Sequence, residues 1–298
     1  MNSQNRGLVN LGNSCFVNAI VQAIFAVPLF QDKFLHGVHT NEYSFSNELQ
    51  SLFTRTRENP IVNPSQLVEM VPNMSTHPFY IRKPAKVSEG TQEDAHELFG
   101  LLIENIEREH FLIKNLSFKV NSVISCCGKN CNHQVDKNLT ETNLSLPITK
   151  SDLGAIIDDY LSDEIINDST CDTCNKEHLK RTFVPNDLPE VLCIHLKRFK
   201  RTYNKYSQTE ETEKITTDVE IPLNLQGNLG TEFRHFYELE SFLSHRGRAW
   251  ELGHYVAFGK HAGNWIKMDD RSLKAQTNRE IDLELKKSYM LFYQKVHK

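Results

Sequence analysis

The apolar positions near the start of the chain predict a helix that is buried almost all round. From Phe16 to Val27 they recur at helical spacing, and further valine and phenylalanine side chains fill a second face. Pro28 follows this run, and we expect the helix to end there. Residues 7–14 before it are rich in glycine and asparagine, which is typical of a loop. The pattern therefore predicts a loop that leads straight into a central core helix.

The remaining patterns place helices early in the chain and strands later. Helices are expected over 44–57, 64–72, 91–106 and 151–163, and strands over 118–125, 144–147, 191–198, 233–243, 254–260, 264–268 and 289–295. The polar, acidic segment 204–220 is predicted to be a hairpin tip or a loop. Because helices come first and strands second, the sequence predicts an α+β fold rather than an alternating α/β fold.

Charge and cysteine usage narrow the possible partners. The chain has 298 residues with 34 basic and 38 acidic side chains, so we expect no nucleic-acid partner. Its apolar runs fall short of the roughly 18 residues that a membrane span needs, and neither end carries a signal or lipidation motif, so we expect no membrane association. Seven cysteines, an odd number, argue against a disulfide framework. We therefore expect an intracellular protein, cytoplasmic or nuclear, that uses cysteine for metal binding or chemistry.

A cysteine stands where the first loop meets the first helix. A helix N-terminus presents unpaired N–H groups and a partial positive charge, and both favour a thiolate at Cys15. The same N–H groups can hold an oxyanion that forms when a thiolate attacks a carbonyl. The alternative is a structural residue, because free cysteine also packs as a small hydrophobe. This stretch alone leaves both interpretations open.

Four further cysteines form two closely spaced pairs, Cys127 with Cys131 and Cys171 with Cys174. Two such pairs match the four thiolates of a closed tetrahedral zinc site. The first pair is wider than the second, and Cys126 or His133 could replace one ligand. The alternative is four unrelated cysteines. We expect a structural zinc ion that stabilises a thin β-ribbon, because four sulfur ligands leave no open position for water.

The last third of the chain carries a histidine and two aspartates on adjacent predicted strands. His254 lies near the start of one strand, and Asp269 and Asp270 end the next. Antiparallel pairing places His254 across from Asp269, as a base and its orienting carboxylate must lie. The alternative for His254, one of 13 histidines, is an ordinary core or surface residue. Nothing in the spacing brings Cys15 near this pair.

Long stretches of the chain resemble the motifs of ubiquitin-specific proteases (USPs), a class of cysteine deubiquitinases. Residues 7–22 resemble the family's cysteine box, 90–98 its glutamine–aspartate helix, 188–199 its central palm strand, 237–257 its histidine box and 289–293 its closing strand. These motifs occur in family order and cover essentially the whole chain. The cysteine pairs depart from the family, which usually has two C-x-x-C pairs, because this chain widens the first.

The resemblance implies one catalytic domain over 1–298 with a papain-like fold that is described as a hand. The helical thumb would span about 1–115, the zinc-pinned β-ribbon of the fingers about 116–190, and the antiparallel sheet of the palm about 191–298. Residues 204–235 could return to the fingers. Ubiquitin would sit on the fingers, with its C-terminal tail in the cleft between thumb and palm.

The resemblance also implies the site and the reaction. The implied catalytic residues are Cys15 as nucleophile, His254 as general base and acid, Asp269 as its orienting partner, Asn10 as oxyanion donor and Asp270 as support. The implied contacts to the ubiquitin tail are Gln92, Asp94, Glu97, Gly253 and Tyr255. The implied reaction is thiol-dependent hydrolysis of the (iso)peptide bond after the C-terminal glycine of ubiquitin, through an acyl-enzyme thioester. One structural zinc ion, no catalytic cofactor, and ubiquitin, polyubiquitin or ubiquitinated proteins as partners complete the expectation.

Three other functions stay open at this point. A USP-like pseudo-protease would hold ubiquitin without cutting it, although the presence of Cys15, His254 and Asp269 counts against it. An isopeptidase for another ubiquitin-like modifier would share the same motifs. A general papain-type peptidase would normally carry a secretory signal and disulfides, which are missing from this sequence.

Overall fold

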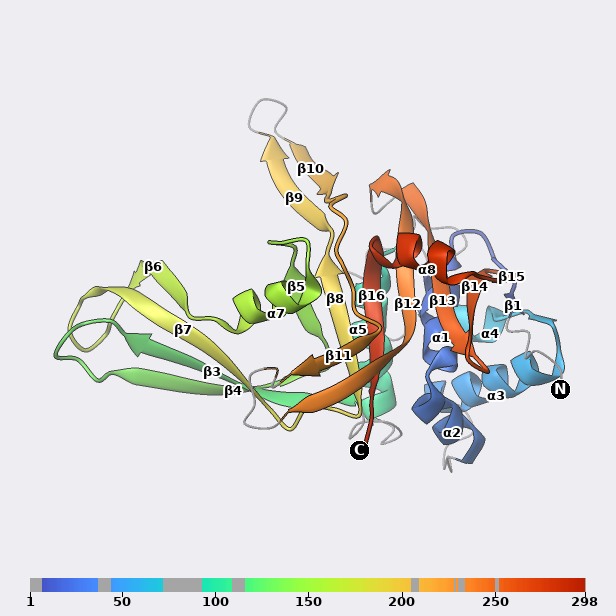
Figure 1. The fold of residues 1–298 in the computed structure, drawn as a ribbon, viewed down its shortest axis with the longest axis horizontal. Helices are drawn as coiled ribbons and strands as arrows, with labels where there is room; N and C mark the ends of the chain where they lie inside the picture. The colour runs from blue at the N-terminus through green and yellow to red at the C-terminus, as the bar shows by residue number, and fades with distance from the viewer. Residues whose placement is uncertain are drawn as a thin grey trace.

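The structure, a computed structural model, describes residues 7–36, 44–71, 93–108, 116–204, 209–227, 229, 234–249 and 252–297. Figure 1 shows helices gathered at one end, a large sheet in the middle and a long ribbon of strands at the other end. Helices dominate before residue 109, and strands dominate after residue 116. The predicted α+β class, with helices first and antiparallel sheets second, is confirmed.

The helical end is built around one buried helix. Its elements are α1 (Cys15–Ala26), α2 (Pro28–His36), α3 (Phe45–Glu58), α4 (Ser65–Met70) and α5 (Ala95–Arg108). Every residue of α1 is buried, as its all-round apolar pattern predicts. The sequence did not predict α2, because Pro28 also opens a helix, for which its fixed φ is well suited. Among the described residues no single helix is long and apolar enough to cross a membrane; only α1 and α2 together, bent by 89°, have the length and composition.

The central sheet has eight strands in the order β15-β14-β13-β12-β16-β8-β5, with β11 also paired to β12. Their bounds are β5 (Leu144–Pro147), β8 (Val191–Lys197), β11 (Asn224–Gly227), β12 (His235–Ala249), β13 (Leu252–His261), β14 (Asn264–Asp269), β15 (Ser272–Ala275) and β16 (Ser288–Lys295). All pairs are antiparallel except β5 with β8.

The middle of this sheet is buried on both faces, which explains the continuous apolar sequence of β8 and β16. Alternate side chains of a strand point to opposite faces. Cys193 accordingly packs with the helical core, while Leu192 and Ile194 pack in a second core that includes residues of α7 (Leu153–Leu161) and α8 (Asn278–Leu285). The sheet therefore lies between two hydrophobic cores.

Helix α1 lies directly on strands β12 and β13. A Cβ atom at Gly259 of β13 would lie only 2.3 Å from the Cβ of Ala26, so the two elements approach more closely than a larger residue allows. The Ser241 hydroxyl of β12 donates a hydrogen bond to the carbonyl of Ala23 at 2.9 Å. These contacts fix the helix that carries Cys15 against the strand that carries His254.

The ribbon at the far end is a four-stranded antiparallel sheet in the order β4-β3-β7-β6 (Figure 1). Its strands are β3 (Phe118–Cys126), β4 (Gln134–Glu141), β6 (Glu164–Thr170) and β7 (Glu177–Asn186), all within the stretch assigned to the fingers. Side chains on both faces of β4 are exposed or half-buried. This part of the ribbon therefore has little hydrophobic core of its own.

A separate hairpin rises from the palm beside the central sheet (Figure 1). It consists of β9 (Phe199–Asn204) and β10 (Thr209–Lys214), which pair only with each other among the described residues. The expected return of residues 204–235 to the fingers is not seen in their described part, because β10 pairs with β9 and β11 pairs with β12. The predicted polar segment 204–220 is thus partly a strand of this hairpin.

Candidate active site

Cys15 is the first residue of α1, at the end of a tightly held loop. The loop begins with β1 (Gly7–Leu8), which pairs in parallel with β2 (Ile61–Val62). The Ser14 hydroxyl accepts a hydrogen bond from the Leu11 N–H at 2.9 Å, and α1 has no acidic residue in its first turn. The first turn therefore has no acidic side chain of its own to offset the partial positive charge of the helix N-terminus next to the Cys15 thiol.

His254 and Asp269 form a direct pair across two strands. His254 Nε2 lies 2.6 Å from Asp269 Oδ1, and Asp269 Oδ2 lies 2.9 Å from Lys267 Nζ. The ladder between β13 and β14 runs up to Ala257 paired with Met268, and the two catalytic candidates lie just beyond its end. The hairpin geometry inferred from the sequence thus brings this histidine and this carboxylate together.

Cys15 completes the group through a hydrogen bond with His254. A hydrogen bond with Cys15 raises the pKa of His254 to about 9, against the effect of burial and with further help from Asp269. Burial alone would raise the pKa of Asp269, but hydrogen bonds with His254 and Lys267 lower it below its usual value. His254 therefore carries its proton at neutral pH, between a thiol and a carboxylate. An imidazolium in this position stabilises a thiolate.

Asp270 joins the two halves of the site. Its carboxylate accepts a hydrogen bond from Asn10 Nδ2 and another from Asn18 Nδ2, each at 2.8 Å. Its carbonyl accepts from the Leu8 N–H at 3.0 Å and from Gln22 Nε2 at 2.8 Å. The residue after Asp269 thereby holds both the loop and the helix that position Cys15. Its carboxylate also lies within 4.8 Å of the ligand atoms of His254 and Asp269, so the expected supporting role of Asp270 stays a prediction.

Asn10 is oriented for hydrogen bonding at the helix N-terminus. One hydrogen of its amide group donates to Asp270, which leaves the second hydrogen for another acceptor. The Ser14 hydroxyl lies 3.4 Å from Asn10 Oδ1 and fixes the other end of the amide. Together with the N–H groups of the first turn of α1, Asn10 could hold an oxyanion formed at a carbonyl that Cys15 attacks.

The predicted tail-binding acids lie at the start of α5. The Asp94 carboxylate accepts a hydrogen bond from Tyr289, with both oxygens 2.7 Å from the hydroxyl, and is half-buried. Glu97 is exposed three residues later and lies on the same helix face. Tyr255 has Asp94 and Cys15 among its electrostatic neighbours, which places the acids beside the catalytic group. Gln92 lies outside the described residues.

Gly253 and Tyr255 flank the histidine in different ways. Gly253 is exposed, as a contact to a substrate requires. The side chain of Tyr255 is buried, and its hydroxyl lies 3.5 Å from the Ala95 N–H. The Tyr255 ring is therefore turned into the core and supports the site from behind, since alternate strand residues face opposite sides. The contact of Tyr255 with the tail that the resemblance implies stays a prediction.

Four cysteines gather at the far end of the fingers. They are Cys126, Cys131, Cys171 and Cys174, with their Sγ atoms within 4.8 Å of one another. The Sγ–Sγ distance is 3.5 Å between Cys126 and Cys174 and 3.8 Å between Cys131 and Cys171. A tetrahedral zinc ion with Zn–S bonds of about 2.3 Å holds its sulfurs about 3.8 Å apart. The donor set and its spacing therefore fit a zinc ion.

Cys126, and not Cys127, completes this group. Cys126 is the last residue of β3, and because neighbouring residues of a strand point to opposite sides, Cys127 is turned away and exposed. The Gly128 N–H faces the Cys126 Sγ at 3.3 Å. Burial alone would raise the pKa of the Cys171 thiol, but nearby backbone N–H groups and thiols lower it to about 6. Against hydrogen bonds with the backbone, burial and hydrogen bonds with neighbouring thiols raise the pKa of Cys126 to about 12 and also raise that of Cys131, so the cysteines of the group differ in charge when no metal is bound.

Two functional side chains were not found from the sequence. Asn18 and Gln22 are fully buried on α1, where they bind Asp270. A signal was present, because two amides four residues apart on an otherwise apolar helix form one polar stripe. Their partner lies near the other end of the chain, and no local pattern points to it.

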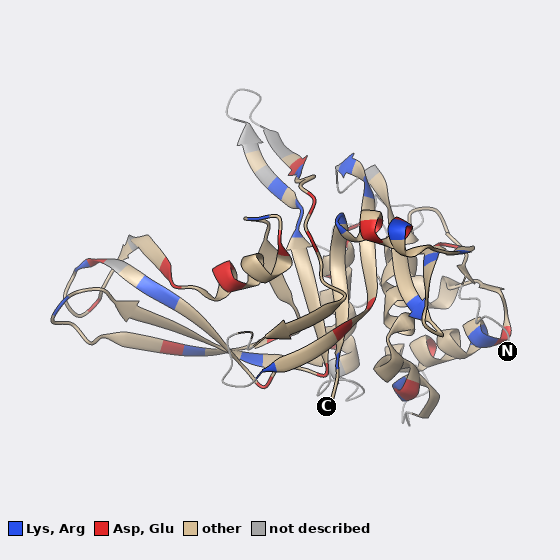
Figure 2. Cartoon of the chain, in the orientation of Figure 1, with Lys and Arg blue, Asp and Glu red and all other residues tan. Residues whose placement is uncertain are grey.

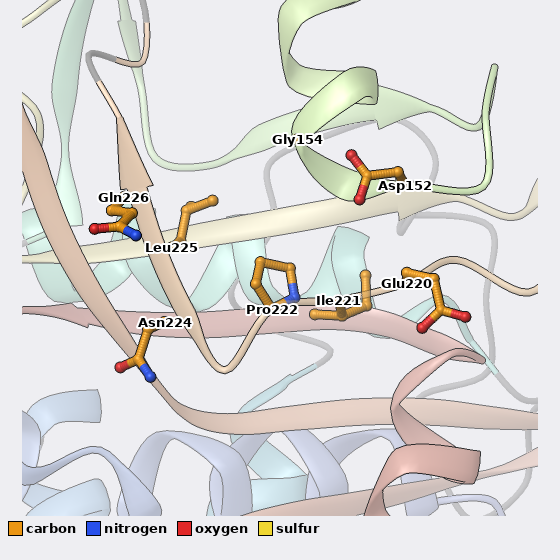
Figure 3. A pocket seen from close by; sticks show the side chains of 8 residues that line it. All are labelled: Asp152, Gly154, Glu220, Ile221, Pro222, Asn224, Leu225 and Gln226. Carbon is orange, nitrogen blue, oxygen red and sulfur yellow. The ribbon is translucent and has the colours of Figure 1, made fainter.

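A pocket elsewhere in the described part of the chain shares no residue with the catalytic group. It is lined by Asp152, Gly154, Glu220, Ile221, Pro222, Asn224, Leu225 and Gln226 (Figure 3). The Asp152 carboxylate caps α7 by accepting from the Ala155 N–H, and Glu220 forms an ion pair with Lys286. Since both acids already have structural partners, we assign no chemistry to this pocket.

Comparisons with known proteins agree with the family resemblance of the sequence motifs. A family model described as ubiquitin carboxyl-terminal hydrolase matches residues 6–293. The chain is 24% identical over 311 residues to the probable ubiquitin carboxyl-terminal hydrolase 8 of Schizosaccharomyces pombe. This alignment covers 97% of the chain and 64% of that protein. The chain is 25% identical over 320 residues to ubiquitin carboxyl-terminal hydrolase 16 of Arabidopsis thaliana, covering 96% of the chain and 30% of that protein. The chain thus spans less than two thirds of either relative.

Solved structures share the fold. The Ubp8/Sgf11/Sus1/Sgf73 SAGA DUB module bound to monoubiquitin matches with a TM-score of 0.81 and 22% identity, over 100% of this chain and 71% of that chain. The same module bound to ubiquitin aldehyde matches with a TM-score of 0.78 and 23% identity, over the same shares. The likeness establishes the fold, and the family model spans nearly the whole sequence. The chain therefore belongs to the ubiquitin carboxyl-terminal hydrolase family, as the resemblance of its motifs to ubiquitin-specific proteases predicted.

Proposed function

We propose that this chain is a thiol-dependent deubiquitinase that hydrolyses the (iso)peptide bond after the C-terminal glycine of ubiquitin. The observation that carries the proposal is the position of His254, which is hydrogen-bonded to Asp269 and to Cys15, the first residue of α1. Family membership gives the substrate class, and a structural relative is described as bound to monoubiquitin and to ubiquitin aldehyde. A nucleophile, a proton carrier and an oxyanion site are the parts that acyl transfer needs.

The proposed reaction uses these parts in sequence. The Cys15 thiolate attacks the terminal glycine carbonyl, and Asn10 with the first-turn N–H groups holds the tetrahedral oxyanion. His254 gives its proton to the leaving amine, which leaves a thioester between Cys15 and ubiquitin. Water then attacks the thioester while His254 accepts a proton as general base, and the carbon–sulfur bond breaks, which releases the C-terminal carboxyl group of ubiquitin and restores the Cys15 thiolate. Asp269 keeps the imidazole oriented throughout, through its hydrogen bond to Nε2.

Selection for the ubiquitin tail is proposed to rest on charge. Asp94 and Glu97 lie beside the catalytic group and would bind basic residues of the tail. Gly253 directly precedes His254, and a Cβ atom there would lie 2.3 Å from the carbonyl oxygen of Arg246. This crowding is with the neighbouring strand β12, so Gly253 lets β13 pair closely with it next to His254.

We further propose one structural zinc ion at Cys126, Cys131, Cys171 and Cys174. Zinc bound there would link the end of β3 to the turn after β6, in a ribbon with little core of its own. Four thiolates leave no open coordination position, so zinc supplies no reaction chemistry. None of the seven cysteines forms a disulfide, and we propose a location in a reducing compartment inside the cell, cytoplasmic or nuclear.

A covalent ubiquitin probe tests the proposed function. Wild-type protein is incubated with ubiquitin that carries a C-terminal electrophile, and the product is analysed by intact mass and peptide mapping. We expect one ubiquitin adduct, on Cys15. Ubiquitin binding without an adduct would instead indicate a pseudo-protease. A matched probe built on another ubiquitin-like modifier should react more slowly, and the reverse order would assign the activity to that modifier.

A further inference from the structure

Lys214 binds the backbone of β12 at the point where that strand pairs with the catalytic histidine. Its Nζ donates to the carbonyl oxygen of His245 at 2.6 Å and to that of Gly247 at 3.0 Å. These two carbonyls flank Arg246, whose partner in the β12–β13 ladder is His254. A single ammonium group thus holds the backbone on both sides of the residue opposite His254.

The two strands approach each other very closely here. Gly247 pairs with Gly253, and the ladder register shifts immediately after this pair. A Cβ atom at Gly253 would lie 2.3 Å from the carbonyl oxygen of Arg246 and 2.3 Å from His245 Nε2. Because there is no slack between the strands, a displacement of β12 at Gly247 must move Gly253. His254 is the next residue.

The imidazole of His245 provides a third partner for the ammonium. Lys214 Nζ lies 3.3 Å from His245 Nδ1, so the carbonyls and the ring together account for the three donors of the lysine. Burial, the charge of Lys214 and that of His254 lower the pKa of His245 to about 3, so the ring is neutral and Nδ1 can accept. The ring packs edge-to-face on Phe199 and on Tyr255.

The base of the β9–β10 hairpin holds Lys214 on its other side. Figure 1 places this hairpin next to β12, and Figure 2 shows basic residues along β9 and an acidic residue near the base of β10. Arg198, just before β9, donates to the carbonyls of Ile215 and Thr217, which follow β10, and to those of Lys286 and Ser288. The backbone directly after Lys214 is therefore held by a buried arginine that makes four hydrogen bonds, and not only by the hairpin.

We propose that Lys214 is a positioning residue for the reaction of Cys15: it holds β12 at Arg246 and Gly247 so that His254, on the paired strand, meets the nucleophile. It touches neither the thiol nor the imidazole of His254. The catalytic part of this proposal rests on the proposed function. Its main test measures the reactivity of the Cys15 thiol. That readout needs no ubiquitin.

The test compares Lys214→Met with wild type in the rate at which iodoacetamide alkylates Cys15, from pH 5.5 to 10. The titratable groups that act on His254 are Cys15 from α1 and Asp269 from β14, and the substitution leaves both in place. His245 of β12 loses the charge of Lys214, but burial, the largest cause of its lowered pKa, remains. A histidine that has moved away stabilises the thiolate less. We expect alkylation to slow about tenfold or more near pH 6.5 and to match wild type near pH 10, where an unassisted thiol ionises.

Two further variants make the test specific. Lys260→Met removes another lysine bound to β12, which pairs with Glu238 at 2.6 Å at the opposite end of the hairpin, and should leave the alkylation profile unchanged. Lys214→Arg keeps a charged donor and should restore most of the reactivity. Turnover of a ubiquitin fluorogenic substrate should follow the same order, mainly through kcat. Inactivity of wild type on ubiquitin would refute the proposed function without affecting the alkylation comparison.

Specific outcomes would overturn the proposal. One is a wild-type alkylation profile in a folded Lys214→Met variant; another is a loss that appears only together with a large fall in melting temperature. If Lys214→Met does not fold, Lys214→Gln is compared with Lys214→Arg, since glutamine keeps a neutral donor only. Equal thiol reactivity in these two variants would show that hydrogen bonds from a charged group at position 214 to β12 do not position His254.

Discussion

Asp270 Oδ2 accepts a hydrogen bond from Asn10 Nδ2 at 2.8 Å, although 260 positions separate the two residues in the chain. Asp269, directly before Asp270, binds His254. The end of one strand therefore orients the proton carrier with one carboxylate and the oxyanion donor with the next. The two chemical functions of the site cannot be positioned independently of each other.

The pair predicts non-additive kinetics. Asn10→Ala should lower kcat by about 10²-fold, the usual effect of losing one oxyanion donor. Asp270→Asn should lower it about tenfold or more by misplacing the same amide; asparagine also tolerates the positive φ of 52° at this position. The double variant should be little worse than Asn10→Ala alone, as measured by ubiquitin-substrate turnover. Multiplication of the two losses would show that Asp270 acts on another part of the site.

Cys15→Ala should abolish cleavage and leave ubiquitin binding roughly intact, because the thiol is not a major binding contact. Turnover and ubiquitin affinity, by calorimetry or fluorescence anisotropy, measure the two effects separately. Cys127→Ser, which changes an exposed thiol outside the four-cysteine group, is the matched control and should behave as wild type. Cleavage by Cys15→Ala would refute the assignment of the nucleophile.

The pH dependence should report His254. With a pKa of about 9, raised by Cys15 and Asp269, His254 holds the proton for the leaving amine below that pH and loses it above. Rates on an isopeptide substrate should therefore fall as the pH rises through about 9. In Asp269→Asn this falling limb should move to lower pH, because the carboxylate that helps to hold the proton is gone. An unchanged limb would mean that another group titrates there.

Substitutions of the adjacent residues Cys126 and Cys127 should affect zinc binding differently. Cys126→Ser or Cys174→Ser should lose zinc and lower the melting temperature, because a closed site contributes its binding energy to folding. Cys127→Ser should keep zinc, since its thiol points away from the group. Elemental analysis of the purified proteins and thermal unfolding, with and without a chelator, measure both. Wild-type protein that contains no metal would contradict the proposed site at once.

Two glycines should respond oppositely to alanine. Gly253→Ala places a Cβ 2.3 Å from backbone and imidazole atoms next to His254, so turnover and stability should both fall. Gly100 lies on the exposed side of α5 with nothing within 4 Å of an added Cβ. Gly100→Ala should raise the free energy of unfolding by roughly 0.5–1 kcal/mol, because alanine suits a helix interior better. Denaturant unfolding of both variants checks the signs.

Sequence patterns predicted the parts of the fold whose burial repeats regularly. The all-round apolar helix α1 and the strands β8, β13, β14 and β16 have strong periodicity, and their positions follow from it. Helix α8 was missed although Thr277 and Glu280 form a capping box at its start, because only two of its eight residues are buried and the apolar signal is weak. Strands β4, β6 and β7 of the exposed ribbon were not predicted, because few of their described side chains are buried and the apolar signal is weak.

Site residues were predictable where geometry is local. The β13–β14 hairpin brings His254 to Asp269 over 15 residues, whereas Cys15 reaches them only through the packing of α1 on the sheet and the hold of Asp270. The choice between Cys126 and Cys127 depends on where β3 ends, and one residue reverses the direction of the side chain. Such details depend on tertiary contacts and strand parity, which a single sequence does not display.

The contact of Gly259 with Ala26 has a mechanical consequence. It lies at the C-terminal end of α1, about 17 Å along the axis from Cys15, and α1 is stiff and enclosed by core. A larger side chain at Gly259 would push this end of α1 away from the sheet, and a tilt of a stiff helix displaces its far end most. The position of the nucleophile therefore depends on a glycine at the opposite end of its own helix as well as on the contacts of Asp270.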